Sequence, residues 1–168
     1  MSKHPINDAL LEGQIIREPV GDEQGYWAGA PGWFWDETDQ AAYVCYRIRR
    51  PRGVEPDRGG ESRIAKTTDF QNFEDVWSVH KDAYQSASIE KSILQRGNDG
   101  KVRYYTSYVA PEDGRWCTTI NTADTVESLD RRIQFVELHH GIPDDTMIGS
   151  IEILSVDDVL HIHQRLTA

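Results

Sequence analysis

The sequence predicts an all-β fold of antiparallel four-stranded units, arranged like the blades of a partial β-propeller. Three observations support this prediction. The apolar runs are short and rich in β-branched and aromatic residues, which suit a pleated, half-buried surface. Turn-forming residues recur about every 8–12 positions, the spacing of short strands in an all-β domain. The order of runs and turns repeats with a period of about 55–60 residues, as expected when each unit is one four-stranded blade.

The first unit covers residues 26–81 and follows a polar leader at 1–25. Its expected strands cover 33–36, 41–49, 61–67 and 73–79, with turns at 36–40 and 68–72 and a loop rich in Pro, Gly and Arg at 50–60. Three of the five tryptophans, Trp27, Trp33 and Trp35, cluster at its start. Trp33 and Trp35 share one face of a strand, so we expect core packing there. Trp27 is the candidate to line a cavity.

The second unit covers residues 82–138 and begins with a predicted β-hairpin. Asp99 and Gly100 lie between two apolar runs, a strong hairpin signal because the turn needs a positive φ that glycine adopts without strain. The expected strands cover 92–95, 102–109, 116–120 and 133–138. Glu90 lies at or just before the first of these strands, and a partial third unit is expected at 139–168.

The net charge and the incomplete number of units limit which partners this chain can have. The formal net charge is -10, which argues against nucleic acid and anionic membrane surfaces, because their phosphates would be repelled. We expect residues 1–168 to form one domain. Two units and part of a third do not close a ring, and unpaired strand edges associate readily. The sequence therefore predicts self-association, a missing remainder of the propeller, or a fold that is not a propeller.

The motifs present favour a cytoplasmic protein without a cofactor. The first residues contain no apolar core of a secretory signal, and no run is long enough to span a membrane. Cys45 and Cys117 fall in expected strands and are interpreted as buried free thiols. No phosphate-binding loop, dinucleotide fingerprint or zinc-type cysteine pair occurs. His161 and His163 share a strand face but have no obvious third ligand, so we expect no metal.

Short motifs in residues 26–138 resemble the five-bladed propeller glycoside hydrolases and glycoside phosphorylases. They are residues 27–32 followed by 43–47, residues 63–70, and residues 89–92 followed by 104–107. The resemblance implies sugar binding at the propeller axis and a glycosyl transfer that uses two or three carboxylates. It also implies a carbohydrate ligand for this chain.

By this resemblance, Glu90 matches the general acid that precedes a strand of a middle blade. The equivalent position in the first unit is Ala30, where an aspartate is expected, and in the third unit it is Gly149 and Ser150. One carboxylate alone gives no complete mechanism for glycoside hydrolysis. A phosphorylase instead needs a basic cluster, and the sequence offers Arg47, Arg49, Arg50, Arg52 and Arg63.

The leading hypothesis is a carbohydrate-active protein with Glu90 as its general acid. The candidate substrate contacts are Trp27, Arg47, Arg63, Tyr84 and Ser88. Two alternatives stay open. The chain is a non-catalytic sugar-binding or assembly module, since the second carboxylate is missing, or it is a small β domain with an unrelated binding role. Likewise, Arg47 and Arg49 either lie on a solvated edge or in ion pairs with Asp57 and Glu61, or they hold a bound carboxylate or phosphate.

Overall fold

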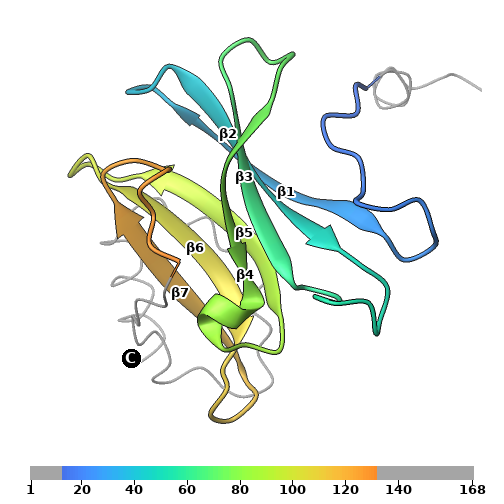
Figure 1. Ribbon diagram of the computed structural model, residues 1–168. Helices are drawn as coiled ribbons and strands as arrows, with labels where there is room; N and C mark the ends of the chain where they lie inside the picture. The colour runs from blue at the N-terminus through green and yellow to red at the C-terminus, as the bar shows by residue number, and fades with distance from the viewer. Residues whose placement is uncertain (1–12, 132–168) are drawn as a thin grey trace, which may run out of the picture.

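The computed structural model describes residues 13–131, which form two antiparallel β-sheets (Figure 1). The strands are β1 (Trp27–Asp36), β2 (Ala41–Arg49), β3 (Glu61–Thr67) and β4 (Glu74–His80) in the first sheet, and β5 (Ile89–Arg96), β6 (Val102–Val109) and β7 (Trp116–Ala123) in the second. Each sheet follows chain order, so every connection within a sheet joins neighbouring strands. One short 3-10 helix, η1 (Lys81–Tyr84), lies in the segment that connects β4 to β5, as Figure 1 shows.

The all-β prediction is confirmed, and so is most of the strand order. The first sheet has the four antiparallel strands expected. The second has three strands among the described residues, and the fourth, expected at 133–138, lies outside them, as do the incomplete third unit and residues 1–12 of the leader. The predicted hairpin joins β5 to β6, and Gly100 has the positive φ of +77° that its turn requires.

The main core fills the space between the two sheets. Its largest fully buried side chains include Tyr84, Ile64 and Tyr104. The ring of Tyr104 packs against that of Trp77, with centroids 4.8 Å apart. The Tyr104 hydroxyl donates to Ser62 Oγ at 2.8 Å, so a buried polar contact also joins the sheets. Each sheet thus covers one face of the other.

The first strands of the two sheets, β1 and β5, approach each other closely. A Cβ at Gly32 of β1 would lie 2.7 Å from the carbonyl oxygen of Ser92 in β5, so only glycine fits there. At the ends of the same strands, Arg96 Nη2 of β5 forms an ion pair with Asp36 Oδ2 of β1 at 2.7 Å. The Asp36 side chain is 1% exposed, so this pair is buried.

Both first strands contain a bulge at the same place. The β1–β2 register shifts between Gly29 and Gly32, and the β5–β6 register shifts between Ile89 and Ser92. In each case the first strand advances by three residues while its partner advances by two. Each bulge therefore contains one extra residue on the first strand. The bulge in β5 contains Glu90. The correspondence between the two units therefore extends to a local irregularity.

The structure differs from the sequence expectation at the start of β1. The expected strand at 33–36 begins six residues earlier, at Trp27. Ala30 adopts a φ of 52° within the bulge. Pro31 is tolerated because β1 is an edge strand of its sheet among residues 13–131, so no strand within that range pairs with its outer side. Trp33 is not core: it is 64% exposed, because it lies opposite Val44 on the face that points away from the second sheet.

Candidate functional site

Glu90 is the second residue of β5 and lies within its bulge. A bulge bends the strand and redirects one side chain out of the regular alternation. Ile89 before it is fully buried, whereas the Glu90 side chain is 44% exposed. The carboxylate is therefore held at the start of a rigid strand yet remains open to solvent, as a ligand contact requires.

Arg47 of β2 holds the Glu90 carboxylate from the buried side. Its side chain is 9% exposed, and its Nη1 forms an ion pair with Glu90 Oε2. The same nitrogen lies 3.4 Å from the carbonyl oxygen of Ile89. The Arg47 Nε is buried and has no hydrogen-bond partner among the described residues. Glu90 thus supplies the compensating charge that a buried guanidinium needs.

The ring of Trp27 covers the other side of this arginine. The Arg47 Cζ lies 5.7 Å from the Trp27 ring centroid, within the range of a cation–π contact. The ring also lies over Gly29, where a Cβ would come within 2.5 Å of ring carbon Cζ2, so glycine permits this placement. Trp27 remains 39% exposed. Part of its indole is therefore free to contact a ligand.

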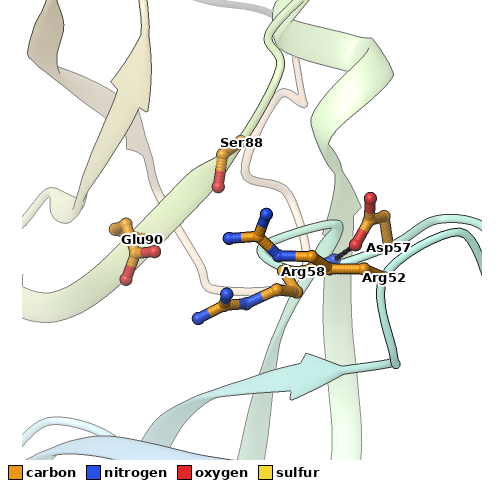
Figure 2. Close-up of a pocket in the computed structure, with 5 residues that line it drawn as sticks. All are labelled: Arg52, Asp57, Arg58, Ser88 and Glu90. Atoms are coloured by element: carbon orange, nitrogen blue, oxygen red, sulfur yellow. Dashed lines mark hydrogen bonds between the residues drawn. The ribbon is translucent and has the colours of Figure 1, made fainter. Parts of the chain in front are cut away.

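An open cavity of about 320 Å³ lies beside Glu90. Figure 2 shows its two sides: Glu90 of β5 with Ser88 just before the strand, and Arg52, Asp57 and Arg58 on the loop that follows β2. In this view the arginine side chains extend from the loop toward the strand. The cavity is therefore formed by both sheets together.

Glycine and backbone hydrogen bonds fix the position of this loop. Ile89 N donates to the carbonyl oxygen of Gly59 at 2.8 Å, which ties the loop to β5. Gly59 has a φ of +69°, and a Cβ there would lie 2.0 Å from Ser88 Oγ. Asp57 also has a positive φ, and its Oδ1 accepts from the backbone N–H of Arg58 at 2.5 Å. The loop is thus held against the strand that carries the acid.

The cavity brings together some of the predicted site residues but not all. Glu90 and Ser88 line it, and Arg47 and Trp27 contact Glu90 or its partner. Arg63 lies elsewhere, where its Nε donates to Glu61 Oε1 at 2.7 Å. Tyr84 is fully buried in the core.

The surroundings of Tyr84 are those of a structural side chain. Its hydroxyl donates to Asn121 Oδ1 at 3.2 Å, and its ring packs against that of Tyr108 with centroids 6.1 Å apart. Burial raises the pKa of the Tyr84 phenol well above its ordinary value. A ligand would have to displace packed core atoms to reach this group.

Sequence reasoning did not assign Arg52, Asp57 and Arg58 to the site. All three lie in a loop without apolar periodicity, so no pattern indicates where their side chains point. Arg52 was noticeable only as part of a basic cluster, and Asp57 only as a possible ion-pair partner. Asp57 matters most, because it places a second carboxylate in the cavity of Glu90.

The described residues offer no evidence for a metal or a membrane span. No group of three or more His, Cys, Asp or Glu in residues 13–131 could hold a metal ion, and His161 and His163 lie outside that range. None of the helices within it is long and apolar enough to cross a membrane. The arrangement around Glu90 offers instead hydrogen-bond donors, acceptors and one aromatic face.

Comparison with known proteins gives a likeness to solved structures but none to a family model. No protein-family model matches the sequence, and no curated relative matches it. Among solved structures, the chain is similar to a glycosyl hydrolase from Bacteroides ovatus, with 14% sequence identity and a TM-score of 0.49 over 69% of this chain. The chain spans 37% of the length of that hydrolase.

Proposed function

We propose that this chain binds a carbohydrate in the cavity beside Glu90, as part of a β-propeller protein. The observation that carries the proposal is the exposed carboxylate of Glu90, fixed by Arg47 in a bulge and facing a loop with further polar groups. Sugar sites combine a few well-placed polar groups with an apolar surface. The sequence motifs that resemble propeller glycoside hydrolases include this same strand.

The chemistry around Glu90 suits a polyhydroxylated ligand. The carboxylate accepts hydrogen bonds from hydroxyl groups, while the guanidinium groups of Arg52 and Arg58 donate them. Ser88 can do both. The exposed part of Trp27 offers an aromatic face for the apolar side of a sugar ring. A ligand of this kind would therefore meet both polar and aromatic contacts within a short span of surface.

The propeller part of the proposal rests on how the sheets are connected. Each sheet is a four- or three-stranded meander, and the chain leaves the outer strand β4 to begin β5 beside β1. Successive blades of a propeller are joined in this way, from the outer strand of one to the inner strand of the next. A further blade would pack face to face against one of the two sheets.

Glycoside hydrolysis is the second candidate, with Glu90 as the general acid. Asp57 favours it, because a second carboxylate in the same cavity is what two-carboxylate hydrolysis requires. The ion pair with Arg47 opposes it, because the Glu90 carboxylate oxygen that would have to face the glycosidic oxygen is already in contact with a guanidinium. Binding is therefore the leading proposal.

Binding is tested by titrating a panel of neutral and acidic oligosaccharides and recording calorimetric heat and tryptophan fluorescence. Glu90→Ala should weaken binding by about tenfold or more, since it removes a charged hydrogen-bond acceptor. The matched control is Glu74→Ala, which removes an exposed glutamate of β4 without touching the cavity. The control should bind as tightly as the wild type. If no member of the panel binds, or if Glu90→Ala binds as tightly as Glu74→Ala and the wild type, the proposal is wrong.

Hydrolysis is tested with aryl glycosides on the same proteins. Turnover that both Glu90→Gln and Asp57→Asn abolish would establish the second candidate, because each change keeps the side-chain shape but removes the ionisable group. Binding without turnover would leave the chain a binding module. Turnover that survives both changes would show that neither carboxylate is catalytic.

A further inference from the structure

Most arginines of residues 13–131 form ion pairs with carboxylates, and two of the four that do not, Arg52 and Arg58, line the cavity; the other two are Arg49 and Arg131. The ion-paired arginines of the described residues are Arg17, Arg47, Arg50, Arg63, Arg96, Arg103 and Arg115. Arg52 and Arg58 form no ion pair within residues 13–131, although both line the cavity with Asp57 and Glu90. Their guanidinium groups are exposed and available to a ligand.

The absence of a carboxylate partner is notable because the chain is acidic. It has 28 acidic and 18 basic residues, so an exposed arginine has many possible partners. The neighbouring carboxylates are engaged in other contacts. Glu90 pairs with Arg47, and Asp57 accepts from the backbone N–H of Arg58. The cavity therefore contains two guanidinium groups that form no ion pair with a side chain of its own loop or strand.

The cavity is richer in positive charge than the chain as a whole. Among the residues that line it, Arg52 and Arg58 balance the charges of Asp57 and Glu90, and the buried Arg47, which pairs with Glu90, adds one positive charge. The rest of the chain carries a net negative charge that repels anions from the remaining surface. An anionic group would thus find its favourable position at this cavity, beside a carboxylate that still accepts hydroxyl protons.

We propose that the sugar bound here carries a carboxylate, as a uronic acid does, and that Arg52 and Arg58 recognise that group. This inference rests on the carbohydrate-binding function proposed above. A guanidinium presents a planar fork of N–H donors that matches a carboxylate, and charge-assisted hydrogen bonds of this kind are about twice as strong as neutral ones. Glu90 contacts the hydroxyl groups of the same sugar, and Trp27 contacts its ring.

The experiment compares a uronic acid oligosaccharide with the neutral oligosaccharide of the same linkage and length. Titrations at low salt should show at least tenfold tighter binding of the acidic sugar to the wild type, with the advantage falling as salt rises. Arg52→Ala and Arg58→Ala should each remove most of that advantage, because each weakens acidic-sugar binding more than it weakens neutral-sugar binding. Arg58→Lys should restore it only in part, because an ammonium keeps the charge but not the fork.

Arg115→Ala is the control, since it changes the net charge equally at an exposed position in the loop before β7. If Arg115→Ala lowers acidic-sugar affinity as much as Arg52→Ala does, overall charge explains the preference and the inference is wrong. Equal affinity for neutral and acidic sugars would also overturn it, while leaving carbohydrate binding established. If inorganic phosphate binds as tightly as the acidic sugar, the cavity is a simple anion site and the inference of a uronic acid is wrong. Failure of every sugar would refute the proposed function itself.

Discussion

Arg96→Met is expected to destabilise the protein more than any comparable arginine change at the surface. Arg96 donates from Nε and Nη2 to Asp36 Oδ2 at 2.9 and 2.7 Å, and the Asp36 side chain is only 1% exposed. Methionine keeps the apolar stem of the side chain but removes the charge. The Asp36 carboxylate would then remain buried with only the backbone N–H groups of Thr38 and Asp39 as donors.

The expected loss is about 3 kcal/mol of unfolding free energy. Breaking a buried ion pair by removing one partner costs about 3–5 kcal/mol, and the two remaining backbone donors place this case at the lower end. For a chain of this length that loss corresponds to a fall of about 6–12 °C in Tm. Chemical denaturation followed by circular dichroism measures the free energy directly, and calorimetry measures Tm.

Arg103→Met is the matched control. Arg103 also forms two hydrogen bonds with one aspartate, at 2.9 and 2.7 Å, but the Asp99 side chain is 51% exposed. Exposed pairs of this kind contribute about 0–1 kcal/mol. If the two variants lose the same free energy, burial of the carboxylate is not what makes the Asp36 pair important, and the reasoning is wrong.

The same pair predicts a pH dependence. Burial alone raises the pKa of Asp36, but hydrogen bonds from Arg96 and from Thr38 N outweigh burial and hold this pKa below its ordinary value. A carboxylate with a depressed folded-state pKa contributes stability above its unfolded pKa, and this stability is lost as the pH falls through the folded value. Wild-type stability should therefore decline below about pH 4, where unfolded aspartate takes up protons. In Arg96→Met, burial dominates, so its deficit against the wild type should shrink toward pH 4.

Three further predictions test the fold at single positions. Trp77→Ala should lower the free energy of unfolding by about 3–5 kcal/mol, because Trp77 is buried between the sheets. Trp33→Ala, at an exposed site, should lower it by less than about 0.5 kcal/mol, and urea denaturation of both variants measures the difference. Iodoacetamide at pH 8 should modify Cys117 before Cys45 in the folded protein. Burial raises the pKa of both thiols, and Cys45 is completely enclosed. Mass spectrometry follows the order of modification, and equal rates at the two cysteines would contradict the prediction. Gly32→Ala should destabilise the chain by more than about 1 kcal/mol, because its Cβ would meet a backbone oxygen of β5 that cannot move away cheaply; an unchanged Tm would show that the strands can separate locally.

The sequence predicts the regular strands and the hairpin turn with good accuracy. The strands β2, β3 and β6 have the predicted bounds, because turn-forming residues on both sides mark where each of these runs begins and ends. The start of β1 could not be predicted in this way. Residues 28–32 contain two glycines and a proline, which disfavour a strand, and only pairing with β2 and the bulge make them one.

The site was predicted in part, for a physical reason that its residues make clear. Glu90 was recognisable because a lone acid stands at the start of an amphipathic strand. Arg47 was expected on a solvated edge or as an anion fork, but the second sheet buries it, and the packing of two sheets leaves no local signature in the sequence. Arg58 and Asp57 lie in a loop whose course depends on glycines and on a hydrogen bond to β5. Such long-range contacts become visible only in three dimensions.

The division of the cavity between two sheets has a thermodynamic consequence. Arg52, Asp57 and Arg58 belong to the first sheet's loop, and Ser88 and Glu90 to the second sheet, so a bound ligand contacts both. A ligand that binds only when the two sheets are packed together stabilises that packing by RT ln(1 + [L]/Kd). At a ligand concentration of a hundred times Kd, this stabilisation is about 2.7 kcal/mol. A ligand would therefore act as a clamp, and a rise in Tm on titration would report occupancy without any catalytic assay. Cutting the chain between residues 60 and 87 would divide the cavity, so ligand affinity should reappear only when the two fragments reassociate.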